Sequence, residues 1–110
     1  MKNNVKAYKV VYNSCGKLFS AVKGSVRYHT DGSLVRPNDY QNNFLFVFET
    51  LQEAELFRCG RTPPSAYETW EVEANNFRYE SETYWTNYYA SDFPEGTAFC
   101  SSLRMIKRVI

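Results

Sequence analysis

The sequence predicts an α+β fold: a single domain with a mostly antiparallel sheet of five to seven strands and one capped helix packed on it. Three observations indicate this fold class. Short segments of alternating apolar and polar side chains recur along the chain, turn-forming residues separate them, and one segment carries a strong helix-start signal. With 110 residues and 12.9 kDa, the chain has the size of one domain, residues 1–110.

A hairpin is expected at the start of the chain. Residues 5–12 alternate with strand periodicity, which places Lys9 and Val11 on the same face. Residues 13–16 are rich in turn formers, and the alternation resumes at residues 17–22. Two antiparallel strands joined by a short turn follow from this pattern.

Two further elements are expected before the helix. Asp31 and Gly32 tolerate the positive φ of a tight turn, which predicts a second, weaker hairpin over residues 25–35. Residues 44–48 form a continuous apolar run of five. Such a run is long enough for a strand covered on both faces and too short for a helix, so we expect a central strand there.

A helix is expected over residues 51–58. The Thr50 hydroxyl can accept a hydrogen bond from the Glu53 amide while the Glu53 carboxylate accepts one from the Thr50 amide, which is a capping box. Gly60 is expected to stop the helix in the left-handed conformation, and two prolines follow it. The face expected to pack on the sheet carries Leu51, Ala54 and Phe57.

The remaining strands are expected in the second half of the chain. Residues 67–74 alternate, with Trp70, Val72 and Ala74 predicted inward and Thr69, Glu71 and Glu73 outward. Asn75-Asn76 suits a tight turn leading into residues 77–79. Residues 97–100 and 103–109 complete the sheet, although the last segment also fits a helical stripe.

Residues 77–95 combine seven aromatic side chains with four acidic residues and one basic residue, Arg78. A strand or an amphipathic helix buries only about half of its side chains, so three or four of these rings are expected at the surface. The alternative is that the rings pack into a local core cluster. Residues 81–90 fit either a second short helix or a loop. The expected contact face consists of Tyr79, Glu80, Glu82, Tyr84, Trp85, Tyr88 and Tyr89.

The net charge of +1 conceals a strong segregation along the chain. Residues 1–36 carry a net charge of +6, residues 37–95 carry −8 and residues 96–110 carry +3. One interpretation is that basic outer strands pair beside acidic middle strands and form cross-strand ion pairs. The other is a bipolar surface that attracts an oppositely charged partner.

The aromatic residues coincide with the acidic ones, which is the wrong sign for a stacking platform on phosphate-bearing strands. Direct binding of nucleic acid is therefore not expected. The expected partner is a host protein with a basic surface. Self-association through the same face, giving a homo-oligomer, is the alternative.

Glu71 and Glu73 form an E-x-E pattern with the carboxylates about 7 Å apart on one face of a strand. Paired carboxylates serve glycoside hydrolysis, and the pattern resembles the acidic motif of ADP-ribosyltransferases, where one carboxylate orients the nicotinamide ribose. With His29, the only histidine, it gives the alternative function, a small nucleotide-binding or ADP-ribosyltransferase-like enzyme domain. In such a site Arg27 or His29 would contact the phosphate or the ribose. A solvated strand edge explains the pair without chemistry, and we favour that interpretation.

No metal or cofactor is expected. Cys15, Cys59 and Cys100 lie far apart and are odd in number, which predicts neither a zinc site nor a disulfide framework. The five glycines are scattered singly, so no phosphate-binding loop is expected. The first residues lead directly into an alternating segment, and no apolar run approaches the ~18 residues of a membrane span. We therefore expect a chain without leader or membrane anchor, located in the reducing cytosol.

The succession YKVVYNSCGKLFSA, FLFVFETLQEAELF, WEVEA and EGTAFCSSLRMIK resembles small α+β proteins of phages and mobile elements. The resemblance runs through most of the chain but includes no functional motif, so it implies a class of protein and no site residues. Such proteins often bind and block a host component, including defence machinery such as CRISPR effectors. The resemblance therefore implies a non-enzymatic, protein-binding inhibitor of the anti-defence or anti-CRISPR type in the host cytosol. An acidic aromatic face would suit it by imitating nucleic acid at a basic groove.

Overall fold

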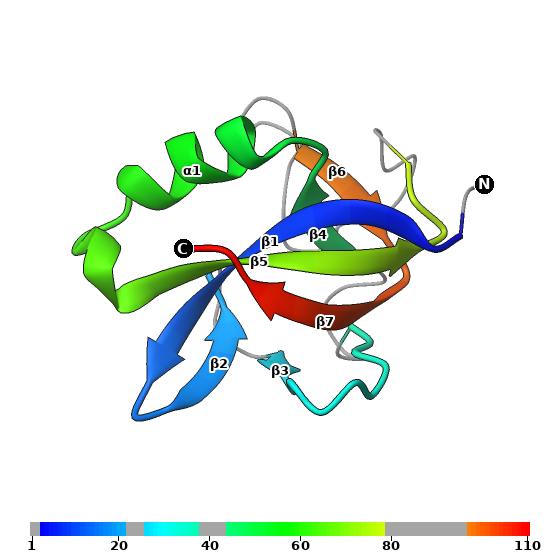
Figure 1. Ribbon diagram of the computed structural model, residues 1–110, viewed down its shortest axis with the longest axis horizontal. Helices are drawn as coiled ribbons and strands as arrows, with labels where there is room; N and C mark the ends of the chain where they lie inside the picture. Colours follow the sequence, from blue (N-terminus) through cyan, green and yellow to red (C-terminus); the bar gives the residue numbers. More distant parts are fainter. Residues whose placement is uncertain (1–2, 22–25, 38–43, 79–96) are drawn as a thin grey trace.

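The computed structural model describes residues 3–21, 26–37, 44–78 and 97–110. These form seven strands, one α-helix and one short 3₁₀-helix (Figure 1). All paired strands run antiparallel, so the predicted α+β fold class is confirmed. The strands are β1 (Val5–Ser14), β2 (Lys17–Ser20), β3 (Arg27–Tyr28), β4 (Leu45–Phe48), β5 (Tyr67–Asn75), β6 (Thr97–Cys100) and β7 (Ser102–Arg108), and the helices are α1 (Leu51–Cys59) and η1 (Pro64–Ala66).

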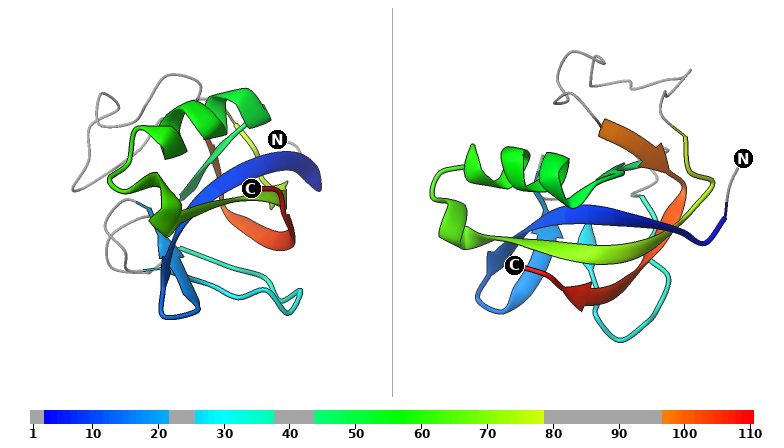
Figure 2. Two further views of the ribbon diagram at one scale, coloured as in Figure 1. Left: turned by 60° about the vertical axis from the view of Figure 1, so that its left-hand side comes forward. Right: turned by 45° about the horizontal axis from the view of Figure 1, so that its top comes forward.

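β1 is the centre of the sheet because three other strands pair with it. One edge of β1 pairs with β5 from Val5 to Tyr12. The other edge pairs with β4 at Tyr8 and with β2 from Val11 to Ser14. β3 extends the sheet beyond β2, β6 extends it beyond β4, and β7 extends it beyond β5. The sheet therefore divides along one edge of β1, and its strands curl away from a common plane (Figure 2).

Two bridges join residues that the sequence did not suggest as partners. Val35 pairs with Leu103 of β7 through hydrogen bonds of 2.8 and 3.0 Å. β3, the other half of the predicted second hairpin, pairs with β2 instead of with the residues around Val35. The predicted second hairpin is therefore wrong. Arg78 pairs with Phe99 of β6, so the chain after the predicted turn at residues 75–76 continues along β6. In both places a partner distant in the sequence replaces the local one.

Side chains are buried on both faces of the sheet. Every residue of β4 is buried, which confirms the predicted central strand. Alternate residues of β4 point into two different clusters. The smaller cluster lies next to α1 and consists of Val10, Ala21, Phe46, Phe48, Ala54 and Phe99. The larger cluster lies on the other face and consists of Ala7, Val11, Leu18, Val26, Tyr28, Val35, Leu45, Val47, Val72, Ala74, Phe77, Ala98, Cys100, Leu103 and Met105.

α1 begins where the sequence predicts. The Glu53 amide donates to the Thr50 hydroxyl (3.2 Å) and the Thr50 amide donates to the Glu53 carboxylate (3.3 Å), which confirms the capping box. The helix ends at Cys59. The predicted left-handed stop at Gly60 is wrong, because its φ is −81°. Its amide donates to the Phe57 carbonyl (3.1 Å), so a tightened last turn ends the helix instead.

α1 lies along one side of β1 and β5 (Figure 2). Ala54 is fully buried against the sheet, and Leu51 is half-buried. The Phe57 ring lies 6.0 Å from the ring of Phe46 and 5.5 Å from that of Phe48, between centroids. These tilted and edge-on contacts are favourable aromatic geometries. The predicted inward face of the helix is thus confirmed.

Thr69 was predicted to face solvent but is fully buried. Its hydroxyl donates a hydrogen bond to the carboxylate of Glu55 on α1. Arg58 binds the same carboxylate, with Nη2 2.9 Å from Oε1. Partial burial of Glu55 acts to raise its pKa, but the hydrogen bonds from Arg58 and Thr69 outweigh it and the pKa is lowered. The charged Glu55 therefore links α1 to β5 by a hydrogen bond and covers Thr69.

Lys9 has no exposed surface and lies on the same face of β1 as Ala7 and Val11. Its Nζ donates to the Phe46 carbonyl (2.7 Å) and lies 3.5 Å from the centroid of the Phe46 ring. No carboxylate in the described part of the chain pairs with it. Burial lowers the pKa of Lys9 to about 7. Above that pH, the buried amine is mainly neutral.

We expect the free energy of unfolding to rise between pH 7 and pH 9. In this window unfolded Lys9, with an ordinary pKa of 10.5, binds a proton that folded Lys9, with a pKa of about 7, has released. The rise should be on the order of 2 kcal/mol, measured by urea unfolding at several pH values. The window ends near pH 9, because burial raises the pKa of Cys100 from 9.0 to about 12 and its ionisation favours the unfolded chain above that pH.

Lys9→Met should remove most of this pH dependence. Lys6→Met is the matched control, because Lys6 is exposed on the same strand and Glu71 raises its pKa, so it adds no slope between pH 7 and pH 9. An unchanged slope in Lys9→Met would contradict a neutral buried amine.

Thr50→Ala should lower the free energy of unfolding by about 1 kcal/mol, because the amides of the first turn lose the capping hydroxyl. Gln52→Ala, at an exposed position of the same helix, should change it by less than about 0.5 kcal/mol. Urea unfolding at one pH compares the two, and equal effects would show that the capping box contributes nothing measurable.

Candidate functional site

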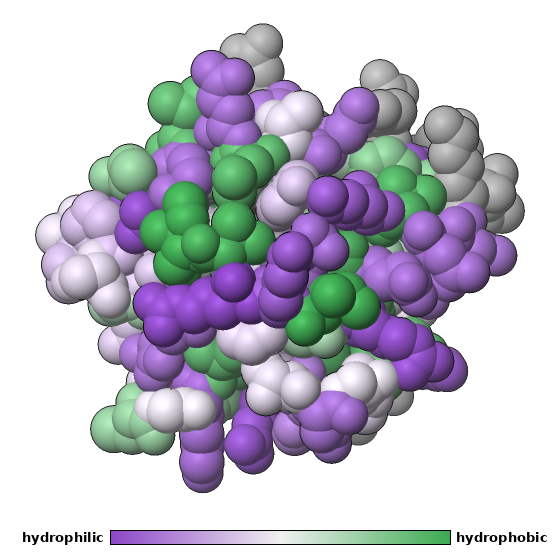
Figure 3. All heavy atoms as spheres, in the orientation of Figure 1, coloured by the Kyte–Doolittle hydropathy of each residue, from purple (hydrophilic) through white to green (hydrophobic). Residues whose placement is uncertain are grey.

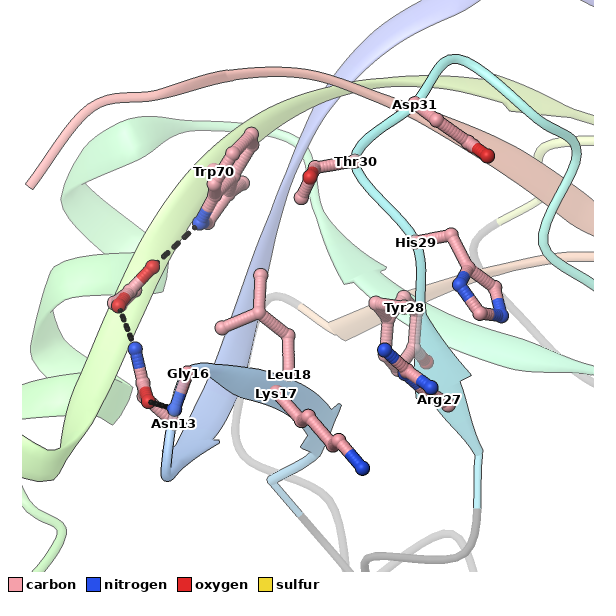
Figure 4. Close-up of a pocket in the computed structure, with 11 residues that line it drawn as sticks. Asn13, Gly16, Lys17, Leu18, Arg27, Tyr28, His29, Thr30, Asp31 and Trp70 are labelled. Carbon is pink, nitrogen blue, oxygen red and sulfur yellow. Dashed lines mark hydrogen bonds between the residues drawn. The ribbon is translucent and has the colours of Figure 1, made fainter.

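A cavity of about 340 Å³ lies where β2, β3 and β5 meet, and we call it the β2–β3 pocket (Figure 4). Its volume is at the lower end of the range for small-molecule sites. Figure 4 shows Trp70 of β5 on one side, Arg27, Tyr28 and His29 on the other, and Leu18 and Thr30 between them. The lining residues are Asn13, Gly16, Lys17, Leu18, Arg27, Tyr28, His29, Thr30, Asp31, Glu68 and Trp70.

Glu68 is a buried carboxylate in the lining of the pocket. Its Oε1 accepts a hydrogen bond from the Trp70 indole nitrogen (2.9 Å) and its Oε2 accepts one from the Asn13 side-chain amide (2.6 Å). Arg108 Nη1 lies 3.6 Å from Oε2. Three groups from β1, β5 and β7 therefore compensate this charge and hold the Trp70 indole in one orientation.

Three basic side chains lie around the opening of the pocket. Leu18 pairs with Tyr28 across β2 and β3, and both are buried. Their neighbours Lys17, Arg27 and His29 are exposed and also line the pocket. In the described part of the chain, no carboxylate forms an ion pair with Lys17 or Arg27. Lys17 and Arg27 therefore give the opening positive charge that the described ion pairs do not neutralise, and the exposed Asp31 carboxylate lines the same side.

Glu71 and Glu73 do not line this pocket. The Glu71 carboxylate lies 3.4 Å from the ammonium nitrogen of Lys6 and 3.9 Å from that of Lys107. Glu73 pairs in register with Lys6 on β1 and with Arg104 on β7. The predicted cross-strand ion pairing is thus confirmed at Glu71. Figure 3 shows hydrophilic side chains crossing the face on which β1, β5 and β7 lie side by side.

His29 is exposed at the opening of the pocket. The nearby Asp31 carboxylate accepts a hydrogen bond from the Ser33 amide (2.9 Å). The hydrogen bonds of Ser33, with a smaller contribution from His29, lower the pKa of Asp31. His29 and Arg27 therefore meet at one pocket, whereas the two carboxylates of the E-x-E pattern lie elsewhere. The residues of the enzyme interpretation are not gathered into one site.

The cysteines show no common site. Cys15 and Cys59 are exposed, and Cys100 is buried. Burial raises the pKa of Cys100 to about 12, so it stays a neutral thiol at ordinary pH. Within residues 3–21, 26–37, 44–78 and 97–110, no group of three or more His, Cys, Asp or Glu side chains could hold a metal ion.

All seven residues predicted for the contact face lie within residues 79–96, outside the described residues, so this face stays a prediction. The structure does describe both flanks of that segment. Arg78 and Phe99 exchange two backbone hydrogen bonds of 2.8 and 2.6 Å. The guanidinium carbon of Arg78 lies 4.1 Å from the centroid of the Phe44 ring, a cation–π contact. The two flanks are thus joined to each other and to the sheet.

No protein-family model, curated protein or solved structure matches this chain. In the described segments, no helix has the length and apolar character needed to cross a membrane.

Sequence reasoning missed Glu68, Asn13 and Thr30 as lining residues of a pocket. A signal was present for Glu68, since strand alternation puts it on the same face as Trp70 and Val72, where a carboxylate is unusual. No local sequence pattern predicts that residues of β2, β3 and β5 line the same pocket.

Glu68→Ala should lower the free energy of unfolding by about 2 kcal/mol, because the Trp70 indole nitrogen and the Asn13 amide, both partly buried, lose their acceptor. Glu71→Ala, three residues along the same strand, should cost less than about 1 kcal/mol, because its two ion pairs involve exposed lysines. Urea unfolding measures both variants. An equal loss of unfolding free energy in both variants would show that the hydrogen bonds accepted by Glu68 do not stabilise the pocket.

Proposed function

We propose that this chain is a non-enzymatic, protein-binding inhibitor of the phage anti-defence type, similar in action to anti-CRISPR proteins. Its contact face lies within residues 79–96, and its partner is a host protein with a basic surface in the host cytosol. Such a protein acts by occupying a groove that otherwise binds nucleic acid.

The Arg78–Phe99 bridge is the observation that carries this proposal. Residues 79–96 follow directly after Arg78 and end three positions before Phe99, and two backbone hydrogen bonds join these flanks. Phe99 is buried in the cluster next to α1, and Arg78 contacts the Phe44 ring. A segment whose two flanks are paired with each other on a sheet is a common way of presenting binding residues.

Charge also supports the proposal. Residues 79–96 contain six aromatic residues, four acidic residues and no Lys or Arg. In the described sheet, by contrast, the carboxylates of Glu68 and Glu71 lie beside cations from the two ends of the chain. The acidic charge of the segment has no such compensation within its own sequence, and electrostatic attraction to a basic partner would follow.

The enzyme alternative has less support. Two lysines accompany Glu71, and neither Glu71 nor Glu73 lines the pocket that includes His29. A nucleotide-processing site would need these groups around one substrate.

The proposal is tested by expressing the chain in bacteria that carry CRISPR immunity or another defence system and infecting them with a phage that the system blocks. We expect plaques to be restored by the unmodified chain and lost in the double variant Trp85→Ala, Tyr88→Ala. Leu56→Ala is the control, because Leu56 is an apolar side chain 71% exposed on α1.

The melting temperature of each purified variant completes this test. The double variant should melt close to the unmodified chain, because the proposed rings contact the partner and not the core. If the chain restores plaques in no system, the anti-defence function is rejected. If the double variant unfolds, the two rings belong to the core and do not form the proposed contact face.

A further inference from the structure

We propose that the β2–β3 pocket binds a nucleotide, that is, a flat heterocyclic ring attached to a phosphate group. The residues that build this pocket are different from those of the proposed contact face. An experiment that rejects one of the two proposals therefore leaves the other unaffected.

The ring would lie against Trp70. This indole is half-buried, lines the pocket and is held by Glu68, which Asn13 also contacts. An aromatic wall whose orientation is already fixed is favourable for stacking on a flat heterocycle. Leu18, between the two sides of the pocket, adds an apolar surface.

Glu68 also makes the inner part of the pocket selective for ligands that carry hydrogen-bond donors. A carboxylate oxygen can accept more than one hydrogen bond, and Oε1 accepts one from Trp70 in the structure. The amino and imino groups of a base are donors suited to the remaining capacity. A ligand with donors on its ring is therefore preferred over a purely apolar ring.

The phosphate would lie at the opening, near Lys17, Arg27 and His29. The described ion pairs include neither Lys17 nor Arg27, so their charges are available to a ligand. The guanidinium of Arg27 can donate two parallel hydrogen bonds to a phosphate. The one carboxylate on this side, Asp31, accepts from the Ser33 amide. An anion at the opening and a ring at Trp70 together require a ligand that carries both groups.

The test uses Trp85→Phe, in which Trp70 is the only remaining tryptophan. Adenosine 5′-monophosphate and a single-stranded ten-residue oligoadenylate are added while Trp70 fluorescence is recorded. We expect saturable quenching by both, about ten-fold weaker binding of adenosine, which lacks the phosphate, and no quenching by inorganic phosphate alone. Much tighter binding of the oligonucleotide would identify a nucleic-acid strand as the source of the nucleotide, and similar binding would identify the free nucleotide.

Arg27→Ala and Lys17→Ala should each weaken binding about ten-fold, because each removes a charge at the opening. Lys107→Ala is the matched control, since it removes an exposed positive charge that pairs with Glu71 and does not line the pocket. Its affinity should stay within about two-fold of the unmodified chain.

The proposal is overturned if neither nucleotide gives saturable quenching at millimolar concentration, or if Lys107→Ala weakens binding as much as Arg27→Ala does. Titration of the unmodified chain, followed through its indole N–H signals by NMR, keeps the test decisive if Trp85→Phe does not fold. The signal of Trp70 should then shift with nucleotide, and its failure to shift would reject the site.

Discussion

Three strands form backbone hydrogen bonds with β1, and the division of its two edges among them determines where the other elements lie. β5 occupies one edge of β1 along eight residues, so the other edge is divided between β4 and β2. The arm that begins with β4 continues to β6 and packs under α1, whereas the arm that begins with β2 continues to β3 and the β2–β3 pocket. Backbone hydrogen bonds along one strand therefore hold both arms. The geometry of the pocket and of the Arg78–Phe99 bridge depends on that strand.

The same strand also carries a fully buried ionisable side chain, Lys9. The side chain of Lys9 starts on the face of β1 that points to the larger cluster. Its amine has as partners the carbonyl and the ring of Phe46, a residue of the smaller cluster. An amine in this position is tolerated because losing its proton avoids most of the cost of burying a charge. The neighbouring Lys6 keeps its charge because it is exposed beside Glu71. Two lysines three residues apart thus differ in protonation because they face opposite sides of β1.

The two proposed binding regions use the sheet in different ways. At the β2–β3 pocket, the sheet itself supplies the site, since Trp70 and Glu68 come from β5 and the basic side chains from β2 and the residues at and after β3. Beside the Arg78–Phe99 bridge, the sheet supplies only the anchor, and the proposed binding residues lie within residues 79–96. The charges of the two regions are also opposite, which is why we propose an anionic small ligand for one and a basic protein for the other.

Elements that depend on neighbouring residues could be predicted from the sequence. The capping box joins residues three apart, the first hairpin closes over a short turn, and alternation assigns Lys9 to the face of Val11. Other features depend on contacts between distant parts of the chain and could not be predicted. Val35 pairs with β7 and Arg78 with β6, α1 covers Thr69, and Glu68 lines a pocket. Local geometry can be predicted because backbone dihedral angles and hydrogen bonds between near neighbours control it. Burial and long-range pairing depend on which distant surfaces meet, and many arrangements satisfy the same pattern of alternation.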